Sequence, residues 1–183
     1  FLARKMIKTF NDKKQLKAWM KSDKKNPPPH IVKQLNLKSY ADSFGLKVLV
    51  ETGTYYGDMV AAMKPYFEKI YSIELSPVLA QLCTRRFKSD SHITIVDGDS
   101  ATILRVIIKS ITQPAIFWLD GHYSAGETAK GLKATPVIEE LTAILDWHQW
   151  PNVILIDDAR LFGTDPAYPD LKTLKKFILS KRE

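Results

Sequence analysis

The sequence predicts an α/β domain in which helices cover both faces of a doubly wound, mostly parallel sheet. Short continuous apolar runs alternate with stretches of helical periodicity, and strands that are buried on both faces have this composition. An acidic residue stands at the end of two of these runs, Glu51 and Glu74, and the first is followed by the turn Gly53-x-x-x-Gly57. The five strands are expected at residues 46–50, 70–74, 93–96, 115–119 and 152–156.

Helix signals lie between these runs. A helix is expected from about Asp58, and Ser76-Pro77 and Thr135-Pro136 each offer an N-cap followed by proline at the first helical position. The chain from Leu171 to Ile178 has the spacing of a last helix. Two sets of apolar residues are expected on the buried faces: Val78, Leu79, Leu82 and Cys83, and Val137, Ile138, Leu141 and Leu145.

Composition limits the class of protein. A chain of 183 residues is long enough for one domain with a real core, and it contains no apolar run that could span a bilayer. Cys83 is the only cysteine, which excludes an internal disulfide and a multi-cysteine zinc site. No signal peptide is visible, because lysines occur throughout the first 25 residues, and we expect a cytoplasmic protein.

The positive charge is confined to the N-terminus. Residues 1–25 carry nine Lys or Arg and two Asp, and nine minus two accounts for the whole net charge of +7. We therefore divide the chain into a basic helical arm with a proline linker, residues 1–29, and an α/β domain, residues 30–183. Apolar residues within the arm predict short basic amphipathic helices. These residues are Leu2, Met6 and Phe10, and then Leu16, Trp19 and Met20.

Two interpretations of the arm stay open. A basic amphipathic helix can contact an anionic membrane surface or a nucleic acid. Alternatively, the arm is a solvated face whose apolar stripe docks on the domain or on a partner. A homo-oligomer also stays open for the chain as a whole. The remaining 158 residues are neutral overall, which disfavours nucleic acid, because phosphate binding needs a basic cleft and not only a tail.

The acids at the first two strand ends have the layout of a mononucleoside site. A glycine turn after the first strand lets a ligand approach the backbone, and an acid after the second can accept two ribose hydroxyls. The pattern Gly-x-Gly-x-x-Gly, typical of NAD dehydrogenases, is absent. The alternative for Gly53 and Gly57 is a tight strand-to-helix turn with no ligand.

These residues resemble a known family. Glu51-x-Gly53-x-x-x-Gly57, Glu74 and Asp97-Gly98-Asp99 are similar to motifs I, II and III of the class I S-adenosylmethionine (SAM) methyltransferases, over roughly residues 45–165. The family has a Rossmann-like sheet of seven strands, so we expect its two C-terminal strands to be missing from this sequence. Tyr55 replaces the glycine of the commonest first motif, which is a form found in sugar and macrolide O-methyltransferases.

The resemblance implies a role for each residue. Glu51 would meet the cationic amino end of SAM, and Glu74 would accept the ribose diol. Asp97 or Asp99 would accept the adenine amine, and Ser100 would cap the next helix. The cofactor site implied by the resemblance consists of Glu51, Gly53, Thr54, Gly57, Glu74, Asp97, Gly98, Asp99 and Ser100.

A second group of acids follows the fourth and fifth strands. Asp120, Asp157 and Asp158 should meet at one edge of the sheet, where their charges repel unless a cation neutralises them. Mg²⁺ prefers such oxygen ligands, and the pattern resembles metal-dependent O-methyltransferases of the sugar and antibiotic type. We therefore expect these three aspartates to hold Mg²⁺ against a substrate hydroxyl, while His122 acts as general base.

Simpler interpretations of these residues also stay open. Asp120-Gly121 can be a turn with its own side-chain hydrogen bond, and Asp157 can cap a turn. Arg160 is expected either to steer an acidic substrate or to pair with the carboxylates. The polar stretch 124–133 is expected to be a lid over the substrate or an ordinary surface connection. Tyrosines at the site are candidates to line the acceptor pocket, namely Tyr55, Tyr56 and Tyr123.

The sequence therefore favours a SAM-dependent O-methyltransferase that acts on a hydroxyl of a small molecule, with a sugar as one candidate. Two alternatives belong to other classes. A metal-dependent hydrolase would use Asp120, Asp157 and Asp158 and would have no need of Glu74 or Gly53. A non-enzymatic SAM-fold protein would bind its partner through the basic arm.

Overall fold

The structure is a computed structural model that describes residues 2–23, 27–121, 135–147 and 149–181, with the backbone alone for residues 2–10. Its strands form one five-stranded sheet of order β3-β2-β1-β4-β5, and every neighbouring pair is parallel. The strands are β1 (Val48–Thr52), β2 (Lys69–Glu74), β3 (Ile93–Asp97), β4 (Ala115–Leu119) and β5 (Val153–Ile156). The predicted doubly wound α/β fold is confirmed, and each strand lies within two residues of its expected position.

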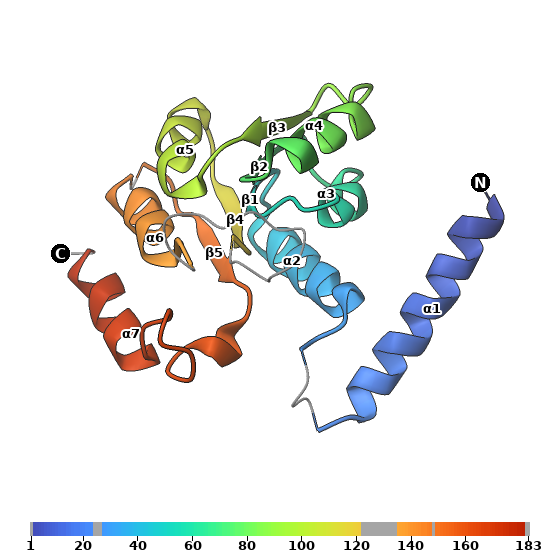
Figure 1. Cartoon of the computed structure of the whole chain (residues 1–183), viewed down its shortest axis with the longest axis horizontal. Helices are drawn as coiled ribbons and strands as arrows, with labels where there is room; N and C mark the ends of the chain where they lie inside the picture. Colours follow the sequence, from blue (N-terminus) through green and yellow to red (C-terminus); the bar gives the residue numbers. More distant parts are fainter. Residues whose placement is uncertain (1, 24–26, 122–134, 148, 182–183) are drawn as a thin grey trace.

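Helices cover both faces of the sheet, as Figure 1 shows, with α2, α3 and α4 on one side and α5, α6 and α7 on the other. Two short 3₁₀ segments, η1 (Ile108–Ser110) and η2 (Ala159–Leu161), follow α5 and β5. The helices are α1 (Leu2–Lys21), α2 (His30–Phe44), α3 (Asp58–Met63), α4 (Pro77–Arg86), α5 (Ser100–Ile107), α6 (Val137–Asp146) and α7 (Leu171–Ser180).

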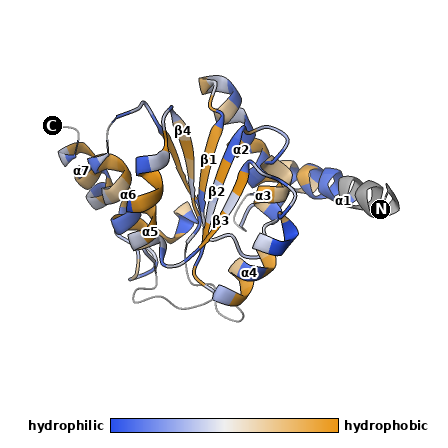
Figure 2. Cartoon of the chain, turned by 90° about the horizontal axis from the view of Figure 1, so that it is seen from above, coloured by the Kyte–Doolittle hydropathy of each residue, from blue (hydrophilic) through white to orange (hydrophobic). Residues whose placement is uncertain are grey.

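Each strand sends alternate side chains into two separate cores, because successive strand residues point to opposite faces. In β1, Val48 and Val50 belong to the core under α5 and α6, whereas Leu49 belongs to the core under α2 and α3. In β4, Phe117 faces the first core and Trp118 the second. Figure 2 shows the strands as a hydrophobic layer between the two sets of helices.

The buried face of α4 differs from the prediction. Leu79 and Cys83 are buried as expected, but Val78 is 74% exposed and Leu82 is 43% exposed. The buried stripe instead includes Ala80, so the sheet meets the helix about one residue further round than the apolar spacing indicated. The predicted cap is confirmed, because Ser76 Oγ accepts a hydrogen bond from Leu79 N.

Two further expectations need correction. The arm contains one continuous helix, α1, and not several short ones. The helix after Thr135-Pro136 begins at Val137, one residue later than predicted, and Pro136 is its N-cap residue. Figure 1 shows α1 standing apart from the sheet, and α1 contacts the covering helix α2. No helix in the described part of the chain combines the length and apolar character needed to cross a bilayer.

The strand order places a topological switch point between β1 and β4. The chain runs outward from β1 through β2 to β3 and then returns to β4 on the other side of β1. The crossover helices on the two sides of this point lie on opposite faces, and in sheets of this kind the carboxyl ends of the two strands are where ligands bind. Glu51 and Asp120 stand at this end of β1 and β4, so the fold brings the two predicted sites together.

Candidate functional site

Glu51 lies within β1, pairs with Ser72 in β2 and is only 2% exposed. Ser72 Oγ donates a short hydrogen bond to Glu51 Oε2, and the hydroxyls of Ser72 and Thr54 are 2.6 Å apart. Burial raises the pKa of Glu51 to about 8, and the charges of Asp120 and Glu74 add to this effect while the Ser72 hydrogen bond opposes it. A cation beside this carboxylate would lower its pKa and stabilise the charged form.

Glu74 ends β2 and holds the turn after β1. Its Oε2 accepts a 2.7 Å hydrogen bond from Tyr55 N, and its Oε1 accepts a 2.9 Å hydrogen bond from Ser76 N. The carboxylate is 6% exposed and joins the β1–α3 turn to the start of α4. Each carboxylate oxygen has two lone pairs, so both oxygens keep the capacity to accept a ligand hydroxyl.

The glycine turn is needed by the protein itself. A Cβ atom on Gly53 would lie 2.3 Å from the carbonyl oxygen of Asp120, and one on Gly57 would lie 2.7 Å from the Phe87 ring. Gly53, Tyr55 and Gly57 all have positive φ angles, of 83°, 50° and 76°. These contacts explain both glycines without a ligand, and Tyr55 within the turn is 47% exposed.

The third predicted segment also lies at the carboxyl end of the sheet. Asp97 is paired in register with Glu74, and its side chain is exposed. The expected cap is displaced by one residue, because Asp99 and not Ser100 caps α5 by accepting a 2.9 Å hydrogen bond from Ala101 N. Ser100 is buried and donates a 2.6 Å hydrogen bond to Glu140 Oε1. Gly98 has a φ of 143°.

Glu140 on α6 was not recognised in the sequence. It is 1% exposed, and burial raises its pKa to about 7 against the opposing hydrogen bonds from Ser100 and Thr52. Its Oε1 would meet a Cβ atom on Gly121 at 2.9 Å. Glu140 therefore joins the loop after β3 to the ends of β1 and β4, and it lines a small pocket with Asp120, Asp157 and Tyr168.

The three aspartates after β4 and β5 do meet, as predicted. Asp120, Asp157 and Asp158 each offer a carboxylate oxygen, and these oxygens all lie within 4.8 Å of one another. Asp157 and Asp158 are buried, and Asp158 has a φ of 54° at the start of η2. Burial raises the pKa of Asp157, and the charge of Asp120 raises it further, while Lys33 opposes the shift.

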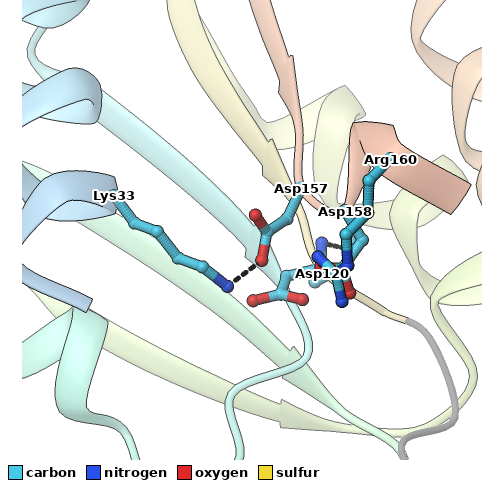
Figure 3. Close-up of polar contacts among 6 residues, drawn as sticks. Lys33, Asp120, Asp157, Asp158 and Arg160 are labelled. Atoms are coloured by element: carbon cyan, nitrogen blue, oxygen red, sulfur yellow. Dashed lines mark hydrogen bonds and ion pairs between the residues drawn. The ribbon is translucent and has the colours of Figure 1, made fainter. Parts of the chain in front are cut away.

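Two cationic side chains reach this cluster (Figure 3). Lys33 Nζ on α2 forms an ion pair with Asp157 Oδ2, and an Arg160 nitrogen forms one with Asp158 Oδ1. Burial opposes the charge on Lys33, but its hydrogen bond to Asp157 and the three carboxylates outweigh burial and raise its pKa. Of the two expectations for Arg160, pairing with a carboxylate is confirmed.

Lys33 is the second residue that sequence reasoning missed. Its ion pair has no local signature, since it joins residues 124 positions apart. Its spacing to Leu37 and Ala41, four and eight residues later, is the one usable signal, because those two residues are the buried face of α2. A lysine on the buried face of a helix that precedes β1 points toward the sheet.

Several predicted residues lie outside the described part of the chain. His122 and Tyr123 fall in the range 122–134, as does the whole candidate lid at 124–133. The structure therefore leaves the general base and the lid as predictions.

Comparison with known proteins finds no match among protein-family models or among curated proteins. Solved structures do match. The O-methyltransferase TomG from Streptomyces achromogenes, involved in tomaymycin synthesis and solved in complex with SAM, superposes with a TM-score of 0.61. It is 18% identical, and the match covers 91% of this chain and 74% of TomG.

Two other structures support the same fold. The SAH-bound methyltransferase PaMTH1 from Podospora anserina matches with a TM-score of 0.55 and 14% identity, over 98% of this chain and 82% of PaMTH1. The N-methyltransferase NodS from Bradyrhizobium japonicum WM9 matches with a TM-score of 0.52 and 13% identity, over 81% of this chain and 79% of NodS. At these identities the likeness concerns the fold and not the acceptor. The chain thus has the Rossmann-like fold of the SAM-dependent methyltransferases.

Proposed function

We propose that this protein is a SAM-dependent methyltransferase that methylates a hydroxyl of a small molecule. The observation that carries the proposal is the pair of buried carboxylates, Glu51 and Glu74, on neighbouring parallel strands on either side of the left-handed turn 53–57. This pair lies beside the topological switch point, where open α/β sheets bind ligands.

The residues present fit the cofactor. Glu51 is buried with a pKa near 8, so a cationic amine beside it would stabilise its charged form. Glu74 would accept the ribose hydroxyls while keeping its bonds to Tyr55 N and Ser76 N. Thr54 shares a hydrogen bond with Ser72, the partner of Glu51, and Asp97, Gly98, Asp99 and Ser100 are proposed to flank the adenine. SAM supplies a methyl group on a sulfonium, which an acceptor oxygen attacks in line.

The acceptor is proposed to bind at the carboxyl ends of β4 and β5. Asp120, Asp157, Glu140 and Tyr168 line a small pocket there, and its polar side chains are candidate hydrogen-bond partners for an acceptor hydroxyl. Asp120 N donates a 3.1 Å hydrogen bond to the carbonyl oxygen of Thr52 in β1. This bond fixes the start of the loop after β4 beside the proposed cofactor site. His122 follows Asp120 by two residues and remains the proposed general base.

The aspartates offer the oxygen ligands that Mg²⁺ prefers. Asp120, Asp157 and Asp158 are hard oxygen ligands close enough to share one ion, and Mg²⁺ held there would lower the pKa of an acceptor hydroxyl. Lys33 and Arg160 already neutralise two of the three charges, however, so repulsion among the carboxylates does not by itself require a metal.

The proposal is tested by calorimetric titration of SAM into the wild-type protein and into Glu74→Gln. We expect micromolar binding by the wild type and a loss of about 10- to 100-fold in Glu74→Gln, because the amide keeps the shape of Glu74 but loses a charged acceptor. Glu68→Gln is the matched control, because Glu68 is exposed and immediately precedes the start of β2, whereas Glu74 is at its end. It should bind SAM as the wild type does.

The acceptor half of the proposal needs a second readout. A panel of polyhydroxylated acceptors, sugars included, is incubated with SAM in the presence of Mg²⁺ or of EDTA, and SAH release is measured. If the folded protein fails to bind SAM at all, the methyltransferase proposal is wrong, and hydrolase activity of the aspartate cluster becomes the next assay.

A further inference from the structure

Lys33 stands where a metal ion would be expected. It lies in the first turns of α2, and Leu37 and Ala41 on the same face fix the helix against the core. Its ammonium reaches past the end of β1 to Asp157 after β5, as Figure 3 shows. The side chains of Lys33 and Asp157 are 18% and 6% exposed, so solvent screens this ion pair only weakly.

The position of the ammonium leaves little room for a second cation. The donor oxygens of Asp120, Asp157 and Asp158 lie within 4.8 Å of one another, and Lys33 is bound to one of them. A divalent ion shared by the three would sit within a few ångströms of the ammonium, and two cations at that separation repel strongly in a half-buried site. Arg160, bound to Asp158, adds to the repulsion from the other side.

We propose that Lys33 is a positioning residue that holds the place of a divalent cation in the aspartate cluster, so that a metal binds there only when Lys33 is displaced. Through the ion pair, Lys33 fixes the orientation of Asp157 in the acceptor pocket. Its relevance to acceptor binding rests on the proposed methyltransferase function. Its exclusion of metal does not, because that property belongs to the cluster alone.

The test is a titration with Mn²⁺, followed by electron paramagnetic resonance and by thermal unfolding, on the full chain. Lys33→Gln should bind Mn²⁺ at least 10-fold more tightly than the wild type. Its melting temperature should be lower than that of the wild type without metal, because Asp157 loses its partner, and should rise more on addition of Mn²⁺.

Two control variants separate charge from structure. Lys33→Arg retains the cation and should respond to Mn²⁺ as the wild type does. Lys38→Gln removes a lysine from the same helix whose partner, Asp42, lies outside the cluster, and it should leave Mn²⁺ affinity unchanged.

Unchanged or weaker Mn²⁺ binding in Lys33→Gln would overturn the proposal. If Lys33→Gln unfolds, the same Mn²⁺ titration is made on Lys33→Met, which keeps the apolar stem of the side chain. A variant that unfolds should refold with Mn²⁺, and failure of Mn²⁺ to rescue either one counts against the proposal. SAM titration of the wild type is independent of all these outcomes, so the failure of each proposal can be told apart.

Discussion

Glu51 is a carboxylic acid that the fold buries, where its ionised form is unfavourable. It is 2% exposed, and its pKa of about 8 in the folded chain stands well above the value of 4.5 expected for a glutamate in water. Between these two values the unfolded chain releases the proton and the folded chain retains it. Glu51 therefore lowers the stability of the folded protein progressively as the pH rises from about 4.5 to about 8.

Glu51→Gln should remove this dependence on pH. The amide has nearly the same shape and never ionises, so the variant should gain stability relative to the wild type as the pH rises from 5 to 8.5. The upper bound of the gain is about 5 kcal/mol, from a shift of roughly 3.5 pKa units at about 1.4 kcal/mol each. Urea unfolding at several pH values measures the difference.

The difference between the two proteins is the informative quantity, because Glu140 and Asp157 titrate in both. Glu68→Gln, at an exposed position, supplies the baseline. A constant difference between wild type and Glu51→Gln across this pH range would mean that Glu51 is ionised throughout, and the electrostatic argument for a cationic ligand beside it would fail.

Whether a site residue could be predicted from the sequence depends on whether its position is fixed by its own strand or by a distant contact. Glu51 and Glu74 could be found from sequence because each follows or ends an apolar strand, and the carboxyl ends of parallel strands always share one edge. The partners of Lys33 and Glu140 could not be found, because each residue reaches the strand ends from a helix whose rotation about its axis the sequence leaves undetermined. The hydrogen bond of Ser100 to Glu140 spans 40 residues and has no local signature.

At the scale of elements, the strands were predictable and the helix faces were less so. A strand buried on both faces is a continuous apolar run, and its limits are visible in the sequence. The predicted buried face of α4 was wrong, because Val78 and Leu82 are as apolar as the residues that are buried. The helix covers the part of the sheet whose edge strand is β3. The continuity of α1 was missed because its two apolar stripes were interpreted as two helices.

The turn between β1 and α3 gives a prediction at this scale. Gly53 and Gly45 both have positive φ angles, of 83° and 64°, but a Cβ atom would meet backbone only at Gly53, where Asp120 O is 2.3 Å away. Gly45→Ala should cost about 1–2 kcal/mol of unfolding free energy, the cost of a left-handed backbone. Gly53→Ala should cost at least about 2 kcal/mol more, because β1 and β4 must also separate.

Chemical denaturation of the two variants measures both costs, and SAM titration shows whether the turn still forms. Equal destabilisation of the two variants would contradict the close approach of the turn to Asp120. The comparison also separates the two explanations of Gly53, a tight turn and access for the ligand. If the glycine were needed only for ligand access, Gly53→Ala would lower SAM affinity without lowering stability.

At the scale of the whole molecule, the sheet and the arm have different characters. The alternation of strands and helices in the sequence predicts a parallel sheet. The order β3-β2-β1-β4-β5, which brings both acidic groups to one edge, is known from the structure. The net charge lies entirely before residue 26. Lysines that the structure describes on α1 are exposed, namely Lys13, Lys14, Lys17 and Lys21.

Deletion of residues 1–25 tests whether the arm is separate from the domain. Figure 1 shows α1 apart from the sheet, and no residue of α1 belongs to either of the two cores in the described chain. We expect the shortened protein to unfold cooperatively, with a melting temperature within a few degrees of the full chain and SAM affinity within about 2-fold. Binding to heparin or to anionic vesicles should be lost, because the deletion removes the whole excess of nine basic over two acidic residues. Loss of cooperative unfolding would instead make α1 part of the domain, and its partly buried Leu16 and Trp19 would then be the first contacts to mutate.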